Sequence, residues 1–469
     1  MSFSEELLPA LESCVGPKGV LSDPKDLAAY STDWRGLFHG RPACVVRPAS
    51  TGEVSAVMRS CHKAGAVVVP QGGNTGLAGA ATPDDSGTQV ILSLERMTAI
   101  RRIDPVGLTV EVEAGAILQT VKEAVAAEGR LLPVSLAAEG SAHIGGIIST
   151  NAGGLDVLRY GMTRGLTLGL EVVLPDGRVI DRLKHLRKDN AGYDLKQLFI
   201  GTEGTLGIIT AAVLRLVPFP RHRVTALIAV PDIESAISIF NHAQSEIGEA
   251  LSAFELISGE GLKLVERHKG QSAPVASSDW VLLIEAASSL PGVVAAAEAL
   301  LETAFEAGLA LDGVVANSIS QANAIWALRE GLTEAEAQEG PSLKHDISVP
   351  ITAIPDFLAD AGRVLADLAP TARLNVFGHL GDGNLHYNVW QGNDDLPEQI
   401  MRVVHDAVVR HGGSISAEHG LGQYRVSEWA RLTDADDQDL AAAIKQMLDP
   451  DGLLNPGKGL PVRSRKARS

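Results

Sequence analysis

The chain is short of cysteine and of positive charge, and it contains no long apolar run. Its 469 residues include only Cys14, Cys44 and Cys61, with no C-x-x-C pair, which indicates a reducing compartment and structural thiols rather than a disulfide framework. No apolar stretch approaches the roughly 20 residues of a membrane-spanning helix, and the first residues lack the basic and apolar regions of a signal peptide. The sequence therefore predicts a cytoplasmic location and no membrane span.

The deficit of basic residues excludes one class of partner. The formal net charge is -17, which argues against non-specific nucleic-acid binding, because that needs a basic face. Apolar residues make up 45% of the chain and charged residues 21%, a composition typical of globular proteins. The length predicts two or three domains. An acidic chain can still bind an acidic substrate through a local pair of basic side chains.

Two common nucleotide-binding motifs are also missing. No G-x-G-x-x-G follows a predicted strand, so a Rossmann site is not indicated. Residues 452–459 (GLLNPGKG) nearly match a P-loop. However, Gly459 stands where magnesium needs a hydroxyl, and Pro456 interrupts the run of backbone N–H groups. The sequence therefore argues against NTPase or kinase function.

The first part of the chain alternates strands and helices. A strand at 44–46 precedes a helix that Thr51 can cap and Gly65 can end, and a buried strand follows at 67–69. Further strands are expected at 90–94, 108–112, 170–174, 178–180 and 206–217, with a helix at 117–128. The pattern predicts an α+β domain.

A proline pair, Pro218 and Pro220, marks the best domain boundary. After it, strands are expected at 224–230, 280–286, 375–377 and 385–389. Helices are expected at 291–307, 318–338, 354–367, 395–410 and 440–448. We therefore expect three parts: residues 1–218, residues 219–420, and a C-terminal helical segment, residues 421–469.

Three segments of the first part are rich in glycine: residues 70–76 (PQGGNTG), 145–154 (GGIISTNAGG) and 201–208 (GTEGTLGI). A strand leads directly into the first of them. Glycine lets backbone N–H groups approach a pyrophosphate closely. One such segment alone could be a tight surface turn, but three in one domain favour a phosphate-bearing cofactor.

Histidines and a carboxylate cluster near the C-terminus. His379 and His386 flank a Gly-Asp-Gly turn, and Glu418 and His419 follow about one helix later. Two imidazoles and a carboxylate are the ligand set of an open catalytic metal site. A single histidine is more often a hydrogen-bonded core residue, but the combination favours a metal.

Three long motifs make the chain resemble a known family. Residues 70–77, 145–161 and 187–209 resemble the FAD-binding domain of the vanillyl-alcohol-oxidase/PCMH flavoprotein superfamily. With the C-terminal histidine motifs, the chain resembles its D-2-hydroxyacid dehydrogenase branch, most closely the D-2-hydroxyglutarate dehydrogenases. The resemblance implies a PCMH-type FAD-binding domain of two α+β subdomains, an α+β cap domain that binds the substrate, and a C-terminal segment that returns to the flavin.

The resemblance also implies which residues bind FAD. Covalent relatives carry a histidine in the first glycine-rich loop, whereas this chain has Asn74, so non-covalent FAD is expected. The matching positions are Pro70, Gln71, Gly72, Gly73, Asn74, Thr75, Gly76, Leu77, Pro133, Ser141, Ile144, Gly145, Gly146, Thr150, Asn151, Gly153, Gly154, Tyr160, Gly161, Glu203, Gly204, Gly207, Ile208, Asn455 and Lys458.

The same resemblance makes His379, His386 and Glu418 metal ligands, with zinc favoured and iron or manganese also suited. His419 becomes the base that removes the proton of the substrate hydroxyl.

The resemblance further makes Arg329, Thr333, Lys344 and Asn388 substrate-binding residues. Arg329 and Thr333 are four apart in a predicted helix and so share a face, while Lys344 is expected in a loop. Two cations and a hydroxyl fit a second substrate carboxylate. Asn388 is expected to orient the C1 carboxylate.

The implied reaction is oxidation of a D-2-hydroxy acid, with D-2-hydroxyglutarate favoured, D-malate next, and D-lactate or glycolate as the alternative. A flavin-binding subunit without catalysis and a metal-binding hydrolytic enzyme stay open as other classes. Electron-transfer flavoprotein is the expected electron acceptor, and a homodimer is the expected assembly.

Overall fold

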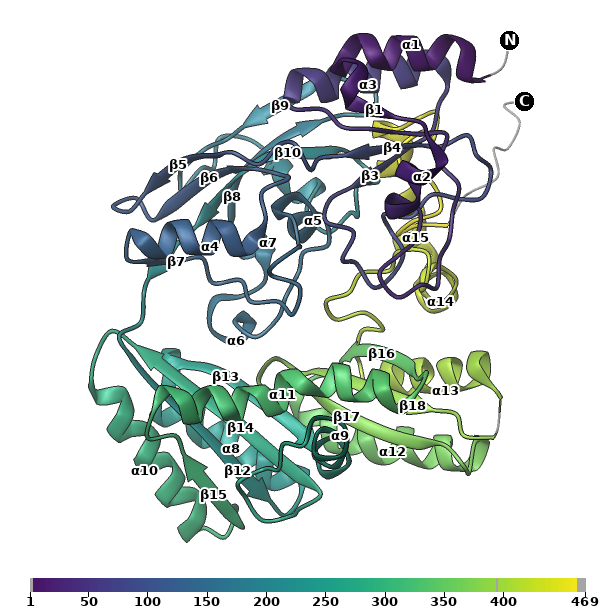
Figure 1. Cartoon of the computed structure of the whole chain (residues 1–469). Helices are drawn as coiled ribbons and strands as arrows, with labels where there is room; N and C mark the ends of the chain where they lie inside the picture. The colour runs from purple at the N-terminus through teal and green to yellow at the C-terminus, as the bar shows by residue number, and fades with distance from the viewer. Residues whose placement is uncertain (1–2, 394, 462–469) are drawn as a thin grey trace. The chain divides into compact units, whose positions relative to one another are not determined.

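The computed structural model describes residues 3–393 and 395–461 as an α+β protein of two compact units (Figure 1). Unit 1 comprises residues 1–153, 162–218 and 418–469, and unit 2 comprises residues 154–161 and 219–417. The chain thus passes from unit 1 to unit 2 after Pro218, and the short segment 154–161 groups with unit 2 although it lies within the first part of the sequence. No helix in the described residues is long and apolar enough to cross a membrane.

Unit 1 contains two main sheets. One has the order β1-β2-β4-β3 and the other the order β5-β6-β10-β8-β9. Its elements are α1 (Phe3–Val15), η1 (Pro17–Gly19), β1 (Val20–Leu21), α2 (Pro24–Leu27), η2 (Ala28–Tyr30), β2 (Cys44–Val46), α3 (Thr51–Ala64), β3 (Val68–Gln71), β4 (Val90–Ser93), β5 (Ile100–Asp104), β6 (Thr109–Glu113), α4 (Leu118–Ala127), β7 (Arg130–Leu131), α5 (Ile144–Ser149), α7 (Thr163–Leu166), β8 (Thr167–Val173), β9 (Val179–Arg182), η3 (Leu195–Leu198), β10 (Ile208–Arg215), β11 (Val217–Pro218), α14 (Val426–Leu432) and α15 (Ala435–Leu448).

Strands β2, β3 and β4 form the parallel part of the first sheet. They are short and almost wholly buried, which is why they are continuous apolar runs rather than alternating ones. Because parallel strands end at the same edge of a sheet, the loop that follows β3 starts at that edge. This loop, residues 72–77, contains the glycines of the first glycine-rich segment, whose Pro70 and Gln71 end β3.

Unit 2 is built on one antiparallel sheet with the order β15-β12-β14-β13-β17-β18-β16. Its elements are α6 (Val157–Tyr160), β12 (His222–Val230), α8 (Ile233–Glu246), η4 (Gly248–Ala250), β13 (Leu251–Ser258), α9 (Gly259–Lys269), β14 (Trp280–Ser288), α10 (Gly292–Glu306), β15 (Asp312–Val315), α11 (Ile319–Glu339), β16 (Leu343–Ser348), η5 (Ile351–Ala353), α12 (Ile354–Leu368), β17 (Arg373–His379), η6 (Leu380–Asp382), β18 (Asn384–Trp390) and α13 (Pro397–Arg410).

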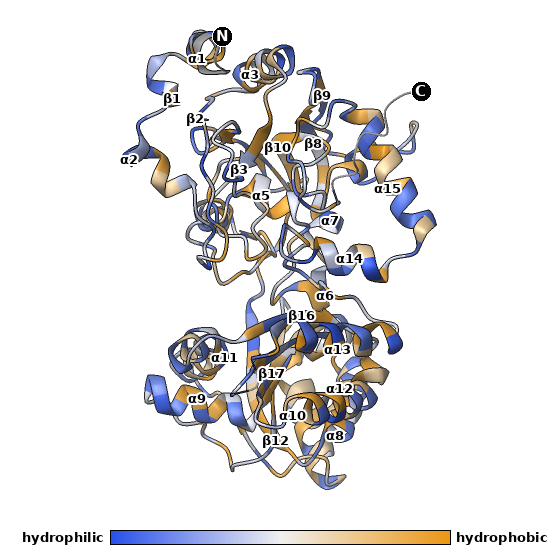
Figure 2. Cartoon of the chain, turned by 90° about the vertical axis from the view of Figure 1, so that its right-hand side faces the viewer, coloured by the Kyte–Doolittle hydropathy of each residue, from blue (hydrophilic) through white to orange (hydrophobic). Residues whose placement is uncertain are grey.

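Helices cover both faces of this sheet (Figure 2). Leu227, Leu283 and Phe377 belong to a core cluster with residues of α9 and α11. The alternate positions Ala226 and Ile284 face α10 instead. Because successive strand residues point to opposite faces, strands buried on both sides are mostly apolar, as β12 to β14 are apart from a few buried polar residues such as Glu255 and Glu285.

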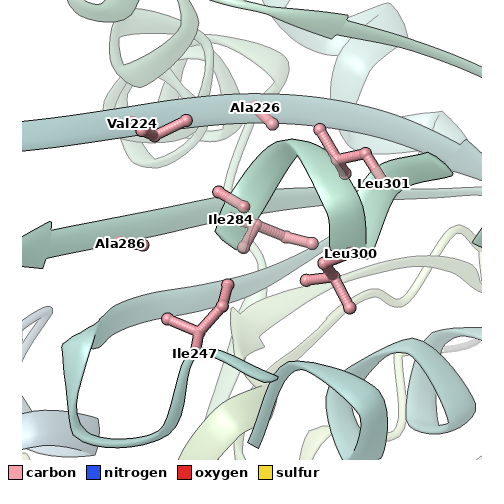
Figure 3. Close-up of a pocket in the computed structure, with 8 residues that line it drawn as sticks. Val224, Ala226, Ile247, Ile284, Ala286, Leu300 and Leu301 are labelled. Carbon is pink, nitrogen blue, oxygen red and sulfur yellow. The ribbon is translucent and has the colours of Figure 1, made fainter. Parts of the chain in front are cut away.

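A small cavity lies between α10 and the sheet (Figure 3). Its volume is about 10 Å³, and only apolar side chains line it, among them Ile247, Leu300 and Leu301. It is too small and too apolar to hold a substrate, and a water there would have no polar partners. We interpret it as a packing defect of the core.

Glu339, at the end of α11, joins α9 and β17 through its carboxylate. His268, Arg373 and Arg267 lie within 3.0 Å of it, and these partners lower the pKa of Glu339 to about 2. A lowered pKa contributes stability that is present above the unfolded value near 4.5 and is lost as the pH falls towards 2.

We therefore expect Glu339→Gln to lower the free energy of unfolding by about 0.5–1 kcal/mol at pH 7. The difference from the wild type should shrink as the pH falls below about 4.5. Urea unfolding of both proteins between pH 8 and pH 3.5 measures this difference. A deficit that stays constant over this range would contradict the assignment.

The predicted helices at 291–307, 318–338 and 354–367 are confirmed as α10, α11 and α12. Thr51 as a cap was wrong, because the Ser50 hydroxyl accepts the Glu53 amide hydrogen instead. The last helix begins at Ala435 rather than at residue 440. Helices α8 and α9 and strands β13, β15 and β16 were not predicted.

Candidate active site

Unit 1 contains most of the predicted FAD-binding residues, and several of them lie near the loop that follows β3. The C-terminal segment runs alongside this strand, since Asn455 donates its amide hydrogen to the Val68 carbonyl oxygen at 2.8 Å. The Asn455 side chain donates to the carbonyl oxygens of Glu203 and Ala80, at 2.8 and 3.1 Å. Segments about 250 and 375 residues away in sequence are thus held together by one amide.

The first glycine-rich loop packs against the segment before α5. A Cβ atom on Gly73 would lie 1.9 Å from the Ser141 carbonyl oxygen, and one on Gly72 would lie 3.3 Å from His143. Likewise, a Cβ on Gly204 would lie 3.1 Å from Pro70. Close approach of another backbone segment therefore requires glycine at Gly73, and Gly72 and Gly204 leave little room for a side chain beside His143 and Pro70. This close packing suits a pyrophosphate cradle.

Substituting Gly73 tests this packing within its own loop. Gly73→Ala places a methyl group on the Ser141 carbonyl, so we expect a loss of about 1–3 kcal/mol in unfolding free energy and a lower content of bound FAD. Gly165→Ala in α7 is the control, since a Cβ there meets nothing within 4 Å and Gly165 is not among the predicted FAD-binding residues. Flavin absorbance per protein and thermal unfolding provide the measurements. Equal behaviour of the two variants would refute the cradle.

Strained backbone concentrates at the same positions. Non-glycine residues with positive φ are rare, and in the described chain they are Asn74, Leu108, Asn151, Glu203, Asp395 and Asn455. Four of these six are predicted FAD-binding residues. Such strain clusters where a ligand is held, and the buried, unpartnered Nδ1 of His143 beside the loop is a further polar atom suited to a ligand.

Glu203 anchors the segment that follows Glu418 and His419. Its carboxylate oxygens accept the amide hydrogens of Leu421 and Gly422, each at 2.8 Å. Burial raises the pKa of the Glu203 carboxyl, and these two amides oppose the shift. Glu203 therefore fixes the start of the C-terminal segment on unit 1.

Lys458 lies in the same unit and is 3% exposed. Burial lowers the pKa of its ammonium group, and Asp84 opposes the shift. A buried cation of this kind suits an anionic group of a cofactor.

The other predicted FAD-binding residues lie on several elements. Gly145 and Gly146 were predicted in a turn but lie in helix α5. Tyr160 was predicted within the first part, residues 1–218, but it ends α6, which belongs to unit 2. Pro70 and Gln71 end β3, residues 72–77 follow it, Ile144 begins α5, and Ile208 begins β10. Pro133, Ser141, Thr150, Asn151, Gly153, Gly204 and Gly207 lie in unit 1 outside helices and strands, whereas Gly154 and Gly161 flank α6 in unit 2.

The hairpin of β17 and β18 brings His379 and His386 together. Their ring centroids are 5.8 Å apart, because the tight turn over residues 380–383 returns the chain within one strand spacing. The Nδ1 atom of His379 lies 2.8 Å from a carboxylate oxygen of Glu255 on β13. A carboxylate that accepts a hydrogen bond from one ring nitrogen of a histidine orients the other ring nitrogen towards a metal.

Glu255 also pairs with Arg329, whose Nε donates to it at 2.8 Å. Burial opposes ionisation of this carboxyl, which is 1% exposed, but His379 and Arg329 outweigh it and lower the pKa of Glu255. Sequence reasoning missed Glu255, because it lies 124 residues before His379.

Asp346 on β16 is a further ligand-type residue that sequence reasoning did not single out. It is the cross-strand neighbour of His386, and its Oδ1 atom lies 3.9 Å from the His386 Nδ1. The Ala417 amide donates to the Asp346 carbonyl oxygen at 3.1 Å, so chain connectivity alone brings the next residue, Glu418, to the same place.

The potential ligand atoms of Asp346, His386, Glu418 and His419 all lie within 4.8 Å of one another. Imidazole nitrogens and carboxylate oxygens suit zinc, and also iron or manganese. The donor set therefore fits a divalent metal. His379 is not part of this group, although its ring lies beside that of His386.

The predicted substrate-binding residues are all in unit 2. Arg329 is buried and Thr333 is exposed on α11, so the two do not have the same surroundings. The prediction of a loop at Lys344 was wrong, because Lys344 lies in β16, directly opposite Asn388 of β18. Both of these side chains contact the buried carboxylate of Glu336.

Comparisons with known families bear on the FAD-binding domain and on the chain as a whole. Residues 42–182 match the model of an FAD binding domain, and residues 219–459 match that of the C-terminal domain of FAD linked oxidases. The chain is 41% identical over 98% of its length to a mitochondrial D-2-hydroxyglutarate dehydrogenase of Bos taurus, of which it covers 84%.

The chain belongs to the FAD-linked oxidase family, among the D-2-hydroxyglutarate dehydrogenases. A D-2-hydroxyglutarate dehydrogenase of Xanthomonas citri pv. viticola is 38% identical over 96% of either chain. Among solved structures, p-cresol methylhydroxylase has a TM-score of 0.76 at 17% identity, with 98% of this chain and 97% of that one covered. This member of the FAD-linked oxidases therefore has the PCMH-type fold, and the prediction of an FAD-dependent oxidoreductase is confirmed.

Proposed function

We propose that this flavoenzyme oxidises a D-2-hydroxy acid to the 2-oxo acid, with D-2-hydroxyglutarate as the leading substrate and D-malate next. The observation that carries the proposal is the hairpin histidine pair beside Asp346 and the Glu418–His419 segment, in a chain that also has an FAD-binding domain. The names of relatives near 40% identity support the substrate.

The bound groups would supply the redox chemistry. When bound, FAD would be held non-covalently around Gly72, Gly73 and Asn455 and would supply the hydride acceptor for C2. A divalent metal, zinc by preference, would supply Lewis-acid polarisation of the C2 hydroxyl. We assign the metal to His379, His386 and Glu418, with Asp346 as a further donor. Asp346 takes a hydrogen bond from the Asn384 side chain at 3.0 Å, which fixes its orientation.

The side chains of the site then divide the remaining work. His419, whose Nε2 lies 3.6 Å from the Glu418 carboxylate, accepts the hydroxyl proton of the substrate, because imidazole is suited to proton transfer near neutral pH. Glu255 holds the His379 ring in one orientation. Arg329, Thr333, Lys344 and Asn388 orient the substrate.

Anaerobic mixing tests the proposal. The purified yellow protein is mixed with D-2-hydroxyglutarate, D-malate, D-lactate and the L-isomers while the visible flavin band is followed. Rapid bleaching by the D-dicarboxylates that is lost after chelation supports the proposal. No bleaching by any of these acids, in protein loaded with FAD and metal, would refute it.

D-lactate or glycolate oxidation is the second candidate. One observation favours it: Arg329 and Lys344 each contact a buried carboxylate, Glu255 and Glu336, so neither cation is left with an uncompensated charge for a second substrate carboxylate. Bleaching by D-lactate at least as fast as by D-2-hydroxyglutarate would select this candidate.

We further propose an electron-transfer flavoprotein as acceptor, a homodimer as assembly and the cytoplasm as location. Relatives in animals and plants are named mitochondrial, whereas the Xanthomonas relative carries no such name. Reoxidation of the reduced flavin by an electron-transfer flavoprotein, light scattering and imaging of a tagged chain test these three points.

A further inference from the structure

A buried carboxylate stands among the residues that would bind the far end of the substrate. Glu336 of α11 has no exposed surface. It pairs with the Lys344 ammonium and accepts hydrogen bonds from the side chains of Asn388, at 2.9 Å, and Asn375, at 3.3 Å. The proposed reaction assigns Glu336 no role.

The strand register places this group beside the histidine pair. Lys344, Asn388 and Asn375 are cross-strand neighbours on β16, β18 and β17. Asp346, His386 and Phe377 form the next row of the same face, two residues along each strand. Two residues of a strand span roughly 7 Å, which is about the reach of a five-carbon hydroxy acid whose C2 hydroxyl lies at the His386 row.

The charges in this group cancel. Lys344 carries the one positive charge of the group and Glu336 the one negative charge, while the two asparagines are neutral. The nearby Arg329 is likewise paired with Glu255. A second substrate carboxylate would therefore meet no net positive charge and would approach the Glu336 carboxylate, and like charges in a buried site repel strongly.

We propose that Glu336 is a specificity-determining residue, a built-in carboxylate that takes the position at Lys344 where the far carboxylate of a dicarboxylic acid would bind. The inference rests on the proposed function, because it assumes that a 2-hydroxy acid extends from His386 towards Lys344. Glu336 weakens the preference for dicarboxylates and admits acids whose far end is polar but uncharged.

Binding of substrate analogues to the wild-type protein gives the first test. Glutarate carries a far carboxylate, and glutaramate has an uncharged amide in its place. Dissociation constants are measured by calorimetry or by the change in the flavin spectrum, so no turnover is needed. We expect the two constants to agree within about threefold, since the group at Lys344 is neutral. A preference for glutarate of about tenfold or more would overturn the proposal.

Glu336→Gln gives the second test, because it removes the negative charge and keeps the shape. We expect glutarate to bind about tenfold more tightly and glutaramate to bind as before. In turnover, KM for D-2-hydroxyglutarate should fall with kcat unchanged, and KM for D-lactate should not move. Glu334→Gln, two residues along the same helix on an exposed side chain, is the matched control.

The double variant Glu336→Gln/Lys344→Met should bind glutarate no more tightly than the wild type. The tighter binding expected of Glu336→Gln comes from the Lys344 ammonium group, whose charge is then no longer neutralised. An unchanged ratio of the two dissociation constants in Glu336→Gln, or the same ratio change in Glu334→Gln, would refute the role of Glu336. If no D-2-hydroxy acid reduces the wild-type flavin, the proposed function fails, while the analogue ratio still decides the role of Glu336.

Discussion

Replacing His419 by alanine is expected to slow the reduction of the flavin by D-2-hydroxyglutarate by about 10²–10⁴-fold, the usual contribution of a positioned general base. The imidazole lies beside Glu418, where it would accept the hydroxyl proton. Because only proton transfer is lost, FAD content and the dissociation constant of glutarate should stay near the wild-type values. Anaerobic stopped-flow absorbance of the flavin measures the rate.

His411→Ala is the matched control for this variant. His411 follows α13 and contacts Asp360 at 3.4 Å, and it is not one of the candidate site residues. The His411→Ala variant should reduce its flavin at a rate within about twofold of the wild type, as is usual for substitutions outside a site. A His419→Ala protein that reduces its flavin at the wild-type rate would exclude this residue as the base, and would revive a flavin-binding subunit without catalysis.

Removing the metal should have the second large effect. His386→Ala takes away a ligand atom of the group formed with Asp346 and Glu418, so we expect loss of one equivalent of metal and a fall in kcat of about 10³-fold. The estimate follows because Lewis-acid polarisation supplies several kcal/mol and each 1.4 kcal/mol is a factor of ten. Elemental analysis and flavin reduction measure the two effects.

Chelation and readdition separate metal loss from misfolding. Treating the wild type with a chelator should lower its thermal midpoint and its rate, and added zinc should restore both, since a ligand stabilises the state that binds it. The same addition should not restore His386→Ala. Asp360→Asn, which alters a carboxylate elsewhere in unit 2, should keep its metal. A wild type without metal that retains full activity would refute the metal site.

Much of the site is local in sequence and could therefore be predicted. Close backbone approach requires glycine at Gly73, positive φ favours glycine at Gly201 and Gly204, and Asn74 and Glu203 of the same segments also have positive φ. The spacing of His379 and His386 fits a hairpin, because a tight turn joins two strands of alternating side chains. Long amphipathic helices such as α12 were also correctly predicted.

Strand β16 could not be predicted, because its sequence LKHDIS carries charged residues and few apolar ones. It lies at the edge of the seven-stranded sheet, where charged side chains are tolerated. Strand β13 was missed for a different reason. It is buried throughout, so its sequence LSAFELIS lacks the regular alternation of apolar and polar residues that marks a half-buried strand.

The sequence by itself determined the family, and it predicted the FAD-binding loops and most of the potential metal ligands, because these predictions depend on residue type and short spacing. Only the tertiary structure decided which charges meet. Glu255 reaches His379 across 124 residues, and Glu336 reaches Asn388 across 52, through strand pairing and helix packing that no local pattern encodes. The charge balance around Lys344, and with it the expected substrate preference, is therefore a property of the fold.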